Sequence, residues 1–224
     1  GLASRHDALL HVLHLTTAVE MGLFNSSHRS QKRITAEVCV HYLWFDESRY
    51  EELGARIKCN PAIKRSTDRE ALIAALNDQR IDIIATDHAP HTATEKAEKY
   101  FKSPAGLPLV QHALLILFDL AANDQISPEL IVDRACHAPA DIFGISERGY
   151  AREGWFADFV IVDPNKPYRV TPLNLLSKCQ WSPYENHEFS ASIDTTIVNG
   201  AIVYEDGKLT GNVAGQRLIY GRAR

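Results

Sequence analysis

The chain has 224 residues, of which 45% are hydrophobic and 23% are charged, and it carries a formal net charge of −4 at pH 7. This composition is ordinary for a globular protein and excludes collagen-like, low-complexity and disordered chains. The acidic balance argues against a protein that binds nucleic acid or a membrane surface, and no apolar run reaches the roughly 18 residues of a membrane span.

The first 148 residues alternate predicted strands with predicted helices. Residues 9–15 form a short apolar run that is typical of a buried strand. Thr17 and Glu20 have the spacing of a capping box and predict the start of a helix. Residues 34–45 are rich in β-branched and aromatic side chains, which favours a second strand.

A clear helix start follows, with Thr67 as the cap and Glu70 at the third position. Residues 81–85 have the pattern of a buried strand, and residues 91–106 form a polar loop of the kind that often carries function. Three further helices are expected, over residues 109–122, from Ser127 with Pro128 at the first helical position, and from Pro139 to Gly144.

The pattern becomes rich in β-structure after Gly149. Residues 159–162 favour a strand, and Asn199-Gly200 within residues 195–204 is a strong hairpin signal. The alternation of strands and helices predicts an α/β fold with a parallel sheet or barrel, and the tail predicts a small β module. We therefore expect two domains, over residues 1–148 and 149–224.

Four cysteines stand at positions 39, 59, 136 and 179, and no Cys-x-x-Cys pair occurs. This spacing excludes a zinc ribbon and a thioredoxin motif. The early residues lack a signal-peptide pattern, so we expect free buried thiols and a cytoplasmic protein. The chain opens at Gly1 and its single methionine is Met21, which leaves open that it is a piece of a longer protein.

An acid and two histidines directly follow the predicted strand at residues 81–85, at Asp87, His88 and His91. In a β/α barrel the carboxyl ends of the strands carry the active site. An aspartate there can bind a metal and also accept a proton from metal-bound water. The alternative is an aspartate that caps the next turn beside histidines with structural hydrogen bonds.

His14, His41 and Asn60 are further candidates at the ends of apolar segments. His14 is either a metal ligand or a packed core residue. For His41 a structural hydrogen bond near the site is favoured, and Asn60 is either a turn former or a hydrogen-bond donor to substrate. The sequence has no dinucleotide-binding glycine motif, P-loop or Gly-x-Ser-x-Gly elbow, which argues against those chemistries.

Several segments resemble, in the same order, motifs of the dihydroorotases, which are cyclic amide hydrolases of the amidohydrolase superfamily. Residues 86–91 (Thr-Asp-His-Ala-Pro-His) resemble the family signature, and residues 14–17 (His-Leu-Thr-Thr) resemble its His-Val-Ser-Thr motif. The other similar segments are residues 36–43, 60–64, 104–106 and 182–185. Together they extend the resemblance over about residues 11–204.

The resemblance implies a β/α barrel with a small β-sandwich and one or two zinc ions. In that family, water activated by zinc attacks the cyclic amide carbon, and an aspartate carries the proton to the departing amide nitrogen. The reaction interconverts dihydroorotate and N-carbamoyl-L-aspartate in pyrimidine biosynthesis. By matched position, His14 and Asp87 would bind zinc, and Asp87 would also be the catalytic proton carrier.

The same matching assigns roles to six more residues. Asn60, His91 and the backbone of Ala105 and Gly106 would contact substrate. His41 and His88 would contact the metal-binding residues and hold them in position. A homodimer is the expected assembly.

The family's His-x-His pair on the first barrel strand has no counterpart, and only 13 residues precede His14. The chain therefore resembles the C-terminal half of a dihydroorotase, with about strands six to eight of the barrel followed by part of the sandwich. Two ligands fall short of the three protein ligands of a catalytic zinc. We expect the N-terminal half of the same enzyme to be the missing partner, and the chain alone to be inactive because half a barrel exposes strand edges.

Three smaller departures affect the expected substrate. Val40, Tyr42 and Lys64 stand where the family has proline, histidine and arginine. A hydantoinase or allantoinase is therefore the second hypothesis. A non-catalytic dihydroorotase-like scaffold is the third, although His14 and Asp87 are both retained.

Overall fold

The computed structural model describes residues 1–221 and divides into two compact units. The first unit comprises Gly1–Leu117 together with Val170–His187. The second comprises Phe118–Arg169 together with the chain from Glu188 onward. The domain boundary expected between residues 148 and 149 stays a prediction.

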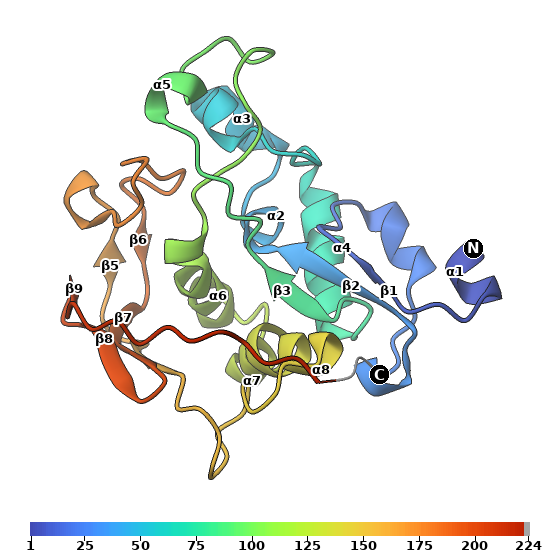
Figure 1. The fold of residues 1–224 in the computed structure, drawn as a ribbon. Coiled ribbons are helices and arrows are strands. Elements are labelled where there is room, and N and C mark those ends of the chain that lie inside the picture. Colours follow the sequence, from blue (N-terminus) through green and yellow to red (C-terminus); the bar gives the residue numbers. More distant parts are fainter. Residues whose placement is uncertain (222–224) are drawn as a thin grey trace. The chain divides into compact units, whose positions relative to one another are not determined.

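The first unit contains a three-stranded parallel sheet in the order β1 (Leu10–Val12), β2 (Ile34–Cys39) and β3 (Ile83–Ala85) (Figure 1). Leu10 pairs with Ile34, and Glu37 pairs with Ile83. The predicted α/β class and parallel sheet are thereby confirmed. All three strands run in the same direction, so their carboxyl ends meet at one edge of the sheet.

The central strand β2 is the core of this sheet. Its side chains Ala36, Val38 and Cys39 are fully buried on alternating faces. Burial of both faces is the usual condition of a parallel strand, because helices cover the two sides. Four of the six residues of β2 are buried, and Ile34 and Glu37 are half-buried.

The strand expected over residues 34–45 extends too far at its carboxyl end. β2 ends at Cys39, and Val40–Trp44 forms the helical turn α2, which is closed by a hydrogen bond from Phe45 N to His41 O of 2.9 Å. Residues 40–43 are all buried. An apolar run that is buried on every side has the same pattern in a strand and in a helix, which is why the sequence predicted the wrong element.

Local capping signals placed the other helices well. Glu20 accepts hydrogen bonds from the backbone of Thr16 and Thr17, as expected, although the element that follows is the 3-10 helix η1 (Ala18–Leu23). For α4 (Ser66–Asn77) the predicted helix is present, but the expected cap is wrong. Arg65 is the N-cap, Thr67 lies inside the helix, and Asp68 Oδ2, not Glu70, accepts from the N-cap backbone (Arg65 N) at 3.3 Å. The remaining helical elements of the first unit are α1 (Leu2–Arg5), η2 (Arg29–Gln31), η3 (Glu47–Arg49), α3 (Tyr50–Leu53), η4 (Gly54–Ile57), α5 (Ala93–Lys96), η5 (Val110–His112) and η7 (Pro172–Asn174), and α6 (Ala113–Ala122) extends into the second unit.

After the end of α6, the second unit contains one continuous helical stretch. Ser127 Oγ accepts a hydrogen bond from Leu130 N at 3.1 Å and so caps α7 (Pro128–Val132), as expected. A single turn of π-helix (Asp133–His137) joins α7 to α8 (Ala138–Phe143). Pro139 has no N–H to donate, and a widened turn accommodates such a residue inside a helix, so the two predicted helices are joined.

The β-rich tail predicted after Gly149 is present in the second unit. An antiparallel sheet has the order β4 (Phe159–Asp163), β7 (Ser192–Val198), β8 (Ala201–Glu205) and β9 (Lys208–Leu209), and β5 (Tyr168–Arg169) pairs with β6 (Glu188–Phe189). Asn199 and Gly200 have φ angles of 49° and 82° between β7 and β8. Such left-handed pairs form tight hairpin turns, so the predicted hairpin is confirmed.

Candidate active site

His14 and Asp87 follow β1 and β3 by two residues each, at the carboxyl edge of the parallel sheet. Both have left-handed backbones, with φ angles of 39° and 49°. A positive φ is uncommon outside glycine and is often retained where a side chain must be aimed for function. Asp87 is exposed and His14 is half-buried, so both are accessible to a ligand.

The donor types of this pair suit zinc, but the pair does not complete a site. β1 and β3 are separated by β2, which puts the two strands about 10 Å apart. Within residues 1–221 there is no group of three His, Cys, Asp or Glu side chains that could hold a metal ion. A catalytic zinc ordinarily has three protein ligands and one open position, so residues 1–221 by themselves supply too few ligands.

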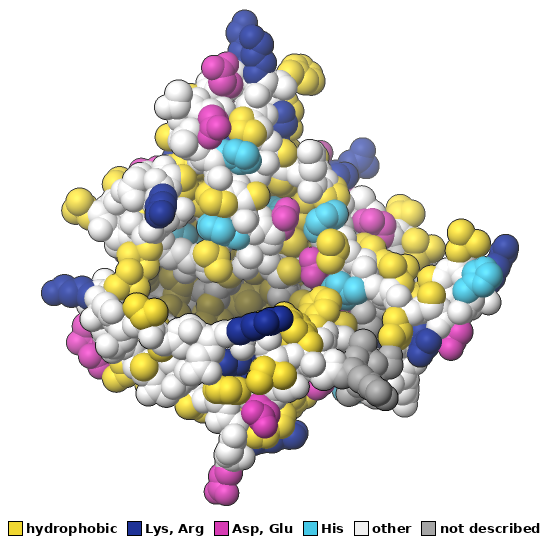
Figure 2. Space-filling model, viewed as in Figure 1, with side chains coloured by type: hydrophobic (Ala, Val, Ile, Leu, Met, Phe, Trp, Pro, Cys, Tyr) yellow, Lys and Arg dark blue, Asp and Glu magenta, His cyan; other side chains and the backbone are white. Residues whose placement is uncertain are grey.

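Figure 2 shows histidine and acidic side chains exposed among apolar ones over the region of β1 and β3. Two thiols of the same unit, Cys39 and Cys59, are buried. Burial, followed by the charges of Glu37 and Asp87, raises the pKa of Cys39 far above its ordinary value. Burial raises the pKa of Cys59 to about 11. Both cysteines are therefore protonated near neutral pH, which argues against a cysteine nucleophile at this edge.

His41 lies in α2, immediately beyond the carboxyl end of β2, and is fully buried. Burial, followed by the charge of the nearby His14, lowers the pKa of His41 to about 3, so its ring is neutral. Among the described residues neither ring nitrogen has a hydrogen-bond partner. The structural hydrogen bond expected for His41 is thus not found within the described chain, and its supporting role stays a prediction.

His88 contacts the start of the next helical element. Its Nδ1 accepts hydrogen bonds from Leu109 N at 2.9 Å and Val110 N at 3.1 Å, and so caps η5. An acceptor Nδ1 in a neutral ring leaves the proton on Nε2. These bonds fix the conformation of the segment that follows Asp87.

The structure brings His91, Ala105 and Gly106 together, although they are far apart in the loop. His91 Nε2 lies 3.1 Å from Ala105 O, and because a carbonyl only accepts, this nitrogen carries the proton. A Cβ atom on Gly106 would lie 2.5 Å from Ala89 O and 3.1 Å from His91 Cδ2. Gly106 also has a φ of 137°, so only glycine allows this close approach without strain.

Asn60 is exposed and precedes Pro61 through a cis peptide bond. The Pro61 carbonyl accepts hydrogen bonds from Tyr42 Oη at 2.6 Å and from Cys59 Sγ at 3.2 Å. Tyr42 comes from α2, so this helical turn fixes the backbone beside Asn60. The substrate contacts expected from Asn60, His91, Ala105 and Gly106 stay predictions, since no ligand tests them.

Two residues near this edge were missed by the sequence analysis. Trp181 Nε1 donates to His91 O at 2.7 Å, and Lys96 is a buried lysine inside the polar loop. Thr92 and Glu95 form a capping box that starts α5, and this pattern is visible in the sequence. It could have indicated that Lys96 lies on a helical turn, but not which groups Lys96 binds.

The amidohydrolase family model matches residues 11–203, and the chain belongs to the amidohydrolase family. It is 34% identical over 207 residues to a dihydroorotase of Clostridium acetobutylicum, covering 92% of this chain and 49% of that protein. It is also 34% identical over 199 residues to an allantoinase of Bacillus velezensis, covering 88% of this chain and 44% of that protein. The chain therefore spans about half the length of the curated relatives that it matches.

Among solved structures the L-hydantoinase from Arthrobacter aurescens has a similar fold, with a TM-score of 0.86 at 23% sequence identity. That match covers 93% of this chain and 47% of the hydantoinase chain. Within residues 1–221, no helix combines the length and the apolar character that crossing a membrane requires. All four cysteines are free thiols, as expected, but the expected burial holds only for Cys39 and Cys59, because Cys136 is exposed and Cys179 is half-buried.

Proposed function

We propose that this chain is the C-terminal portion of a metal-dependent hydrolase that opens cyclic amides, with dihydroorotate as its substrate. In this proposal β1, β2 and β3 are strands six to eight of a β/α barrel, and β4–β9 belong to a β-sandwich. The observation that carries the proposal is the placement of His14 and Asp87, with left-handed backbones, at the carboxyl ends of parallel strands. The identity to proteins named dihydroorotase supports the choice of substrate.

His14 and Asp87 would hold zinc together with ligands from the N-terminal half of the same enzyme, which is the partner that this proposal requires. When bound, one or two zinc ions would polarise the amide carbonyl and lower the pKa of water. The exposed carboxylate of Asp87 is free to take up that proton and to deliver it to the departing nitrogen. A homodimer and a cytoplasmic location belong to the same proposal.

Substrate would lie against the segments that the structure brings to this edge. Asn60 offers a side-chain amide, and its backbone is fixed through the bonds to Pro61 O. His91 donates from Nε2 to Ala105 O, and its Nδ1 lies 4.0 Å from Glu95 Oε2. The backbone of Ala105 and Gly106 would contact the ring of the substrate, because Gly106 has no Cβ atom to block the approach.

A second candidate is a hydantoinase or allantoinase activity. The allantoinase relative is as similar to this chain as the dihydroorotase relative, and Tyr42 stands in the segment that differs from the dihydroorotase pattern. Ring opening of dihydroorotate, allantoin and hydantoin should be measured with the complete polypeptide that contains these 224 residues. Activity on dihydroorotate is expected, and activity confined to the other two rings would overturn the choice of substrate.

The third candidate is a non-catalytic scaffold. It is disfavoured because the two donors of this chain, His14 and Asp87, are both present. The metal content of the complete polypeptide separates the two classes. A folded, metal-free protein that does not bind added zinc would favour the scaffold.

A further inference from the structure

Lys96 is a buried cation that holds three backbone carbonyl groups. Its side chain belongs to the last residue of α5, and the residue is only 3% exposed. Its Nζ donates to Lys58 O at 3.2 Å, to Pro104 O at 3.0 Å and to Gly106 O at 3.0 Å. An ammonium group has three donors, so these three carbonyls satisfy it completely.

The partners of Lys96 are neutral carbonyl dipoles, with no carboxylate among its hydrogen-bond acceptors in the described chain. Burial lowers the pKa of Lys96 to about 8, and the nearby Lys58 acts in the same direction while Cys59 opposes it. The ring of Trp181 lies 5.9 Å from Nζ and adds a cation–π contact. Burial of a charged group costs free energy. The contacts that the buried ammonium group of Lys96 makes therefore indicate its role in the protein.

Local structure directs Lys96 inward. Thr92 N and Thr92 Oγ1 each donate to Glu95 Oε2 at 2.7 Å, which starts the short helix α5 directly after His91. One turn of helix then separates His91 from Lys96. The same turn therefore fixes the histidine at one end and the buried ammonium at the other.

The three carbonyls come from the two segments that carry the proposed substrate-binding residues. Lys58 lies two residues before Asn60, and Pro104 and Gly106 flank Ala105. The two segments are also joined directly, because Gly106 N donates to Lys58 O at 2.9 Å. Without a cation between them, carbonyl oxygens from both segments would converge on one point and repel each other.

We propose that Lys96 is a positioning residue, which sets the distance between Asn60 and the Ala105–Gly106 backbone and so shapes the substrate pocket. This inference rests on the proposed function, because it assumes that these segments bind a cyclic amide. Lys96 does not itself touch the reacting atoms. Its removal should therefore affect substrate binding more than the chemical step.

The kinetic test compares Lys96→Met with Lys99→Met in the complete polypeptide. Lys99 is an exposed lysine of the same loop, so its replacement removes the same charge without the buried contacts. We expect Lys96→Met to lower kcat/KM by about 100-fold, mostly through KM, since small displacements of positioning groups have effects of this size. Lys99→Met should keep the wild-type values.

A second measurement does not depend on activity. Hydrogen exchange of the complete polypeptide reports on the Gly106 amide, which is bound to Lys58 O in the structure. Lys96→Met should speed exchange within residues 103–106, whereas Lys99→Met should leave it unchanged. This result separates the two proposals, because altered exchange in a protein that opens no cyclic amide would contradict the proposed function and retain the role of Lys96 in the loop.

The role of Lys96 is overturned if Lys96→Met has wild-type KM and wild-type exchange. It is also overturned if kcat falls while KM is unchanged. Should Lys96→Met fail to fold, Lys96→Gln, which keeps two donors on a shorter stem, takes its place. An intermediate KM in Lys96→Gln supports the proposal, and a wild-type KM contradicts it.

Discussion

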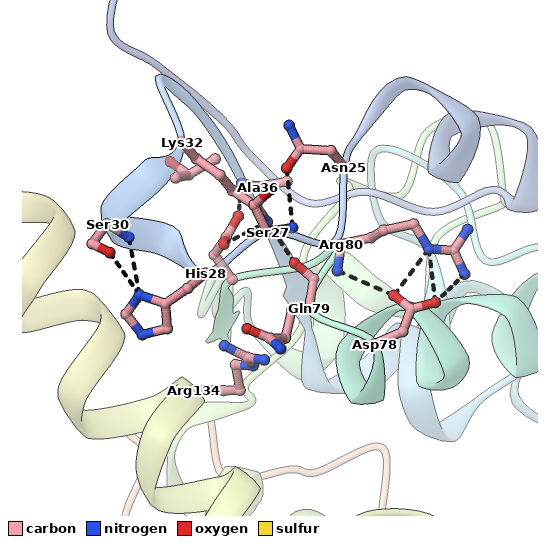
Figure 3. A network of polar contacts seen from close by, with 12 residues as sticks. Asn25, Ser27, His28, Ser30, Lys32, Ala36, Asp78, Gln79, Arg80 and Arg134 are labelled. Atoms are coloured by element: carbon pink, nitrogen blue, oxygen red, sulfur yellow. Dashed lines mark hydrogen bonds and ion pairs between the residues drawn. The ribbon is translucent and has the colours of Figure 1, made fainter.

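The two ends of the parallel sheet differ in how fully their polar groups are satisfied. At the amino end, Lys32 precedes β2, Asp82 precedes β3, and their side chains form an ion pair of 2.8 Å with each side chain 1% exposed. Lys32 also donates to Gln79 O (Figure 3). Asp82 accepts from Ala36 N at 3.0 Å. Each group of this pair has several partners.

At the carboxyl end, His14 and Asp87 have left-handed backbones, and the buried ring nitrogens of His41 have no partner within the described residues. The difference shows where this fold is stabilised and where it carries strain. In β/α barrels, the fold that we propose for the complete polypeptide, the amino ends of the strands serve stability and the carboxyl ends serve chemistry. Two aspartates only five positions apart, Asp82 and Asp87, should therefore respond to mutation in opposite ways.

The largest expected effect comes from Asp87→Asn in the complete polypeptide. Under the proposed function, the substitution removes the carboxylate that would carry the proton and bind the metal, and it should lower kcat by at least about 10³-fold. Stability should be unchanged or slightly higher, because Asp87 is exposed and its backbone is already left-handed, a conformation that Asn tolerates well. Steady-state kinetics and urea unfolding measure the two quantities. A variant that keeps wild-type turnover would remove Asp87 from the mechanism.

Asp82→Asn should produce the opposite pattern. It leaves the Lys32 ammonium buried without its carboxylate, and breaking such a pair costs about 3–5 kcal/mol. The free energy of unfolding, from urea titration of the complete protein, should fall by this amount, while KM of the remaining folded enzyme stays unchanged. The double variant Lys32→Met/Asp82→Leu is the control, and it should recover most of the stability. A loss below about 1 kcal/mol for Asp82→Asn would show that the pair is not the anchor of the amino end.

A smaller effect is expected from pH through His112, which is 1% exposed and whose pKa burial lowers to about 4. The unfolded chain binds a proton at this site below about pH 6.5 and the folded chain does not, so stability falls as pH drops from about 6.5 to about 4, by about 3 kcal/mol in total. His41 acts with the same sign. The free energy of unfolding should therefore be measured for wild type and for His112→Gln over pH 4–7.5. The substitution should make the free energy of unfolding depend less on pH. Parallel curves would contradict this assignment.

The smallest effect should come from Gly106→Ala. A Cβ atom there would lie 2.5 Å from Ala89 O in a backbone that L side chains rarely adopt, and the strain should cost about 1–3 kcal/mol. KM should rise because the contact between His91 and Ala105 is disturbed. Gly22→Ala, with open space at the Cβ position, is the matched control. Equal stability and equal KM in the two variants would contradict the strain expected at Gly106.

Local sequence signals predicted much of this fold. The capping box at Thr17 and Glu20, the cap at Ser127 and the hairpin at Asn199-Gly200 each depend on residues within one turn of each other, and each is present. Strand ends could also be located, which is why His14 and Asp87 were found as candidates.

Long-range partners were not predictable in the same way. Lys32 and Asp82 are 50 positions apart, and Lys96 and Lys58 are 38 apart. A lysine in a polar loop has the same sequence pattern whether it is solvated or buried, because the carbonyls that decide its position carry no side-chain signal. The α2 turn was missed for a related reason, since a fully buried apolar run fits a helix and a strand equally.

The most direct test of the central claim is the turnover of dihydroorotate by the complete polypeptide and by the 224-residue chain alone, measured side by side with added zinc. We expect ring opening by the complete polypeptide and none by the isolated chain, because His14 and Asp87 are the only proposed zinc ligands among the described residues, and two ligands are too few. Turnover by the isolated chain, or no turnover of any cyclic amide by the complete polypeptide, would contradict the account.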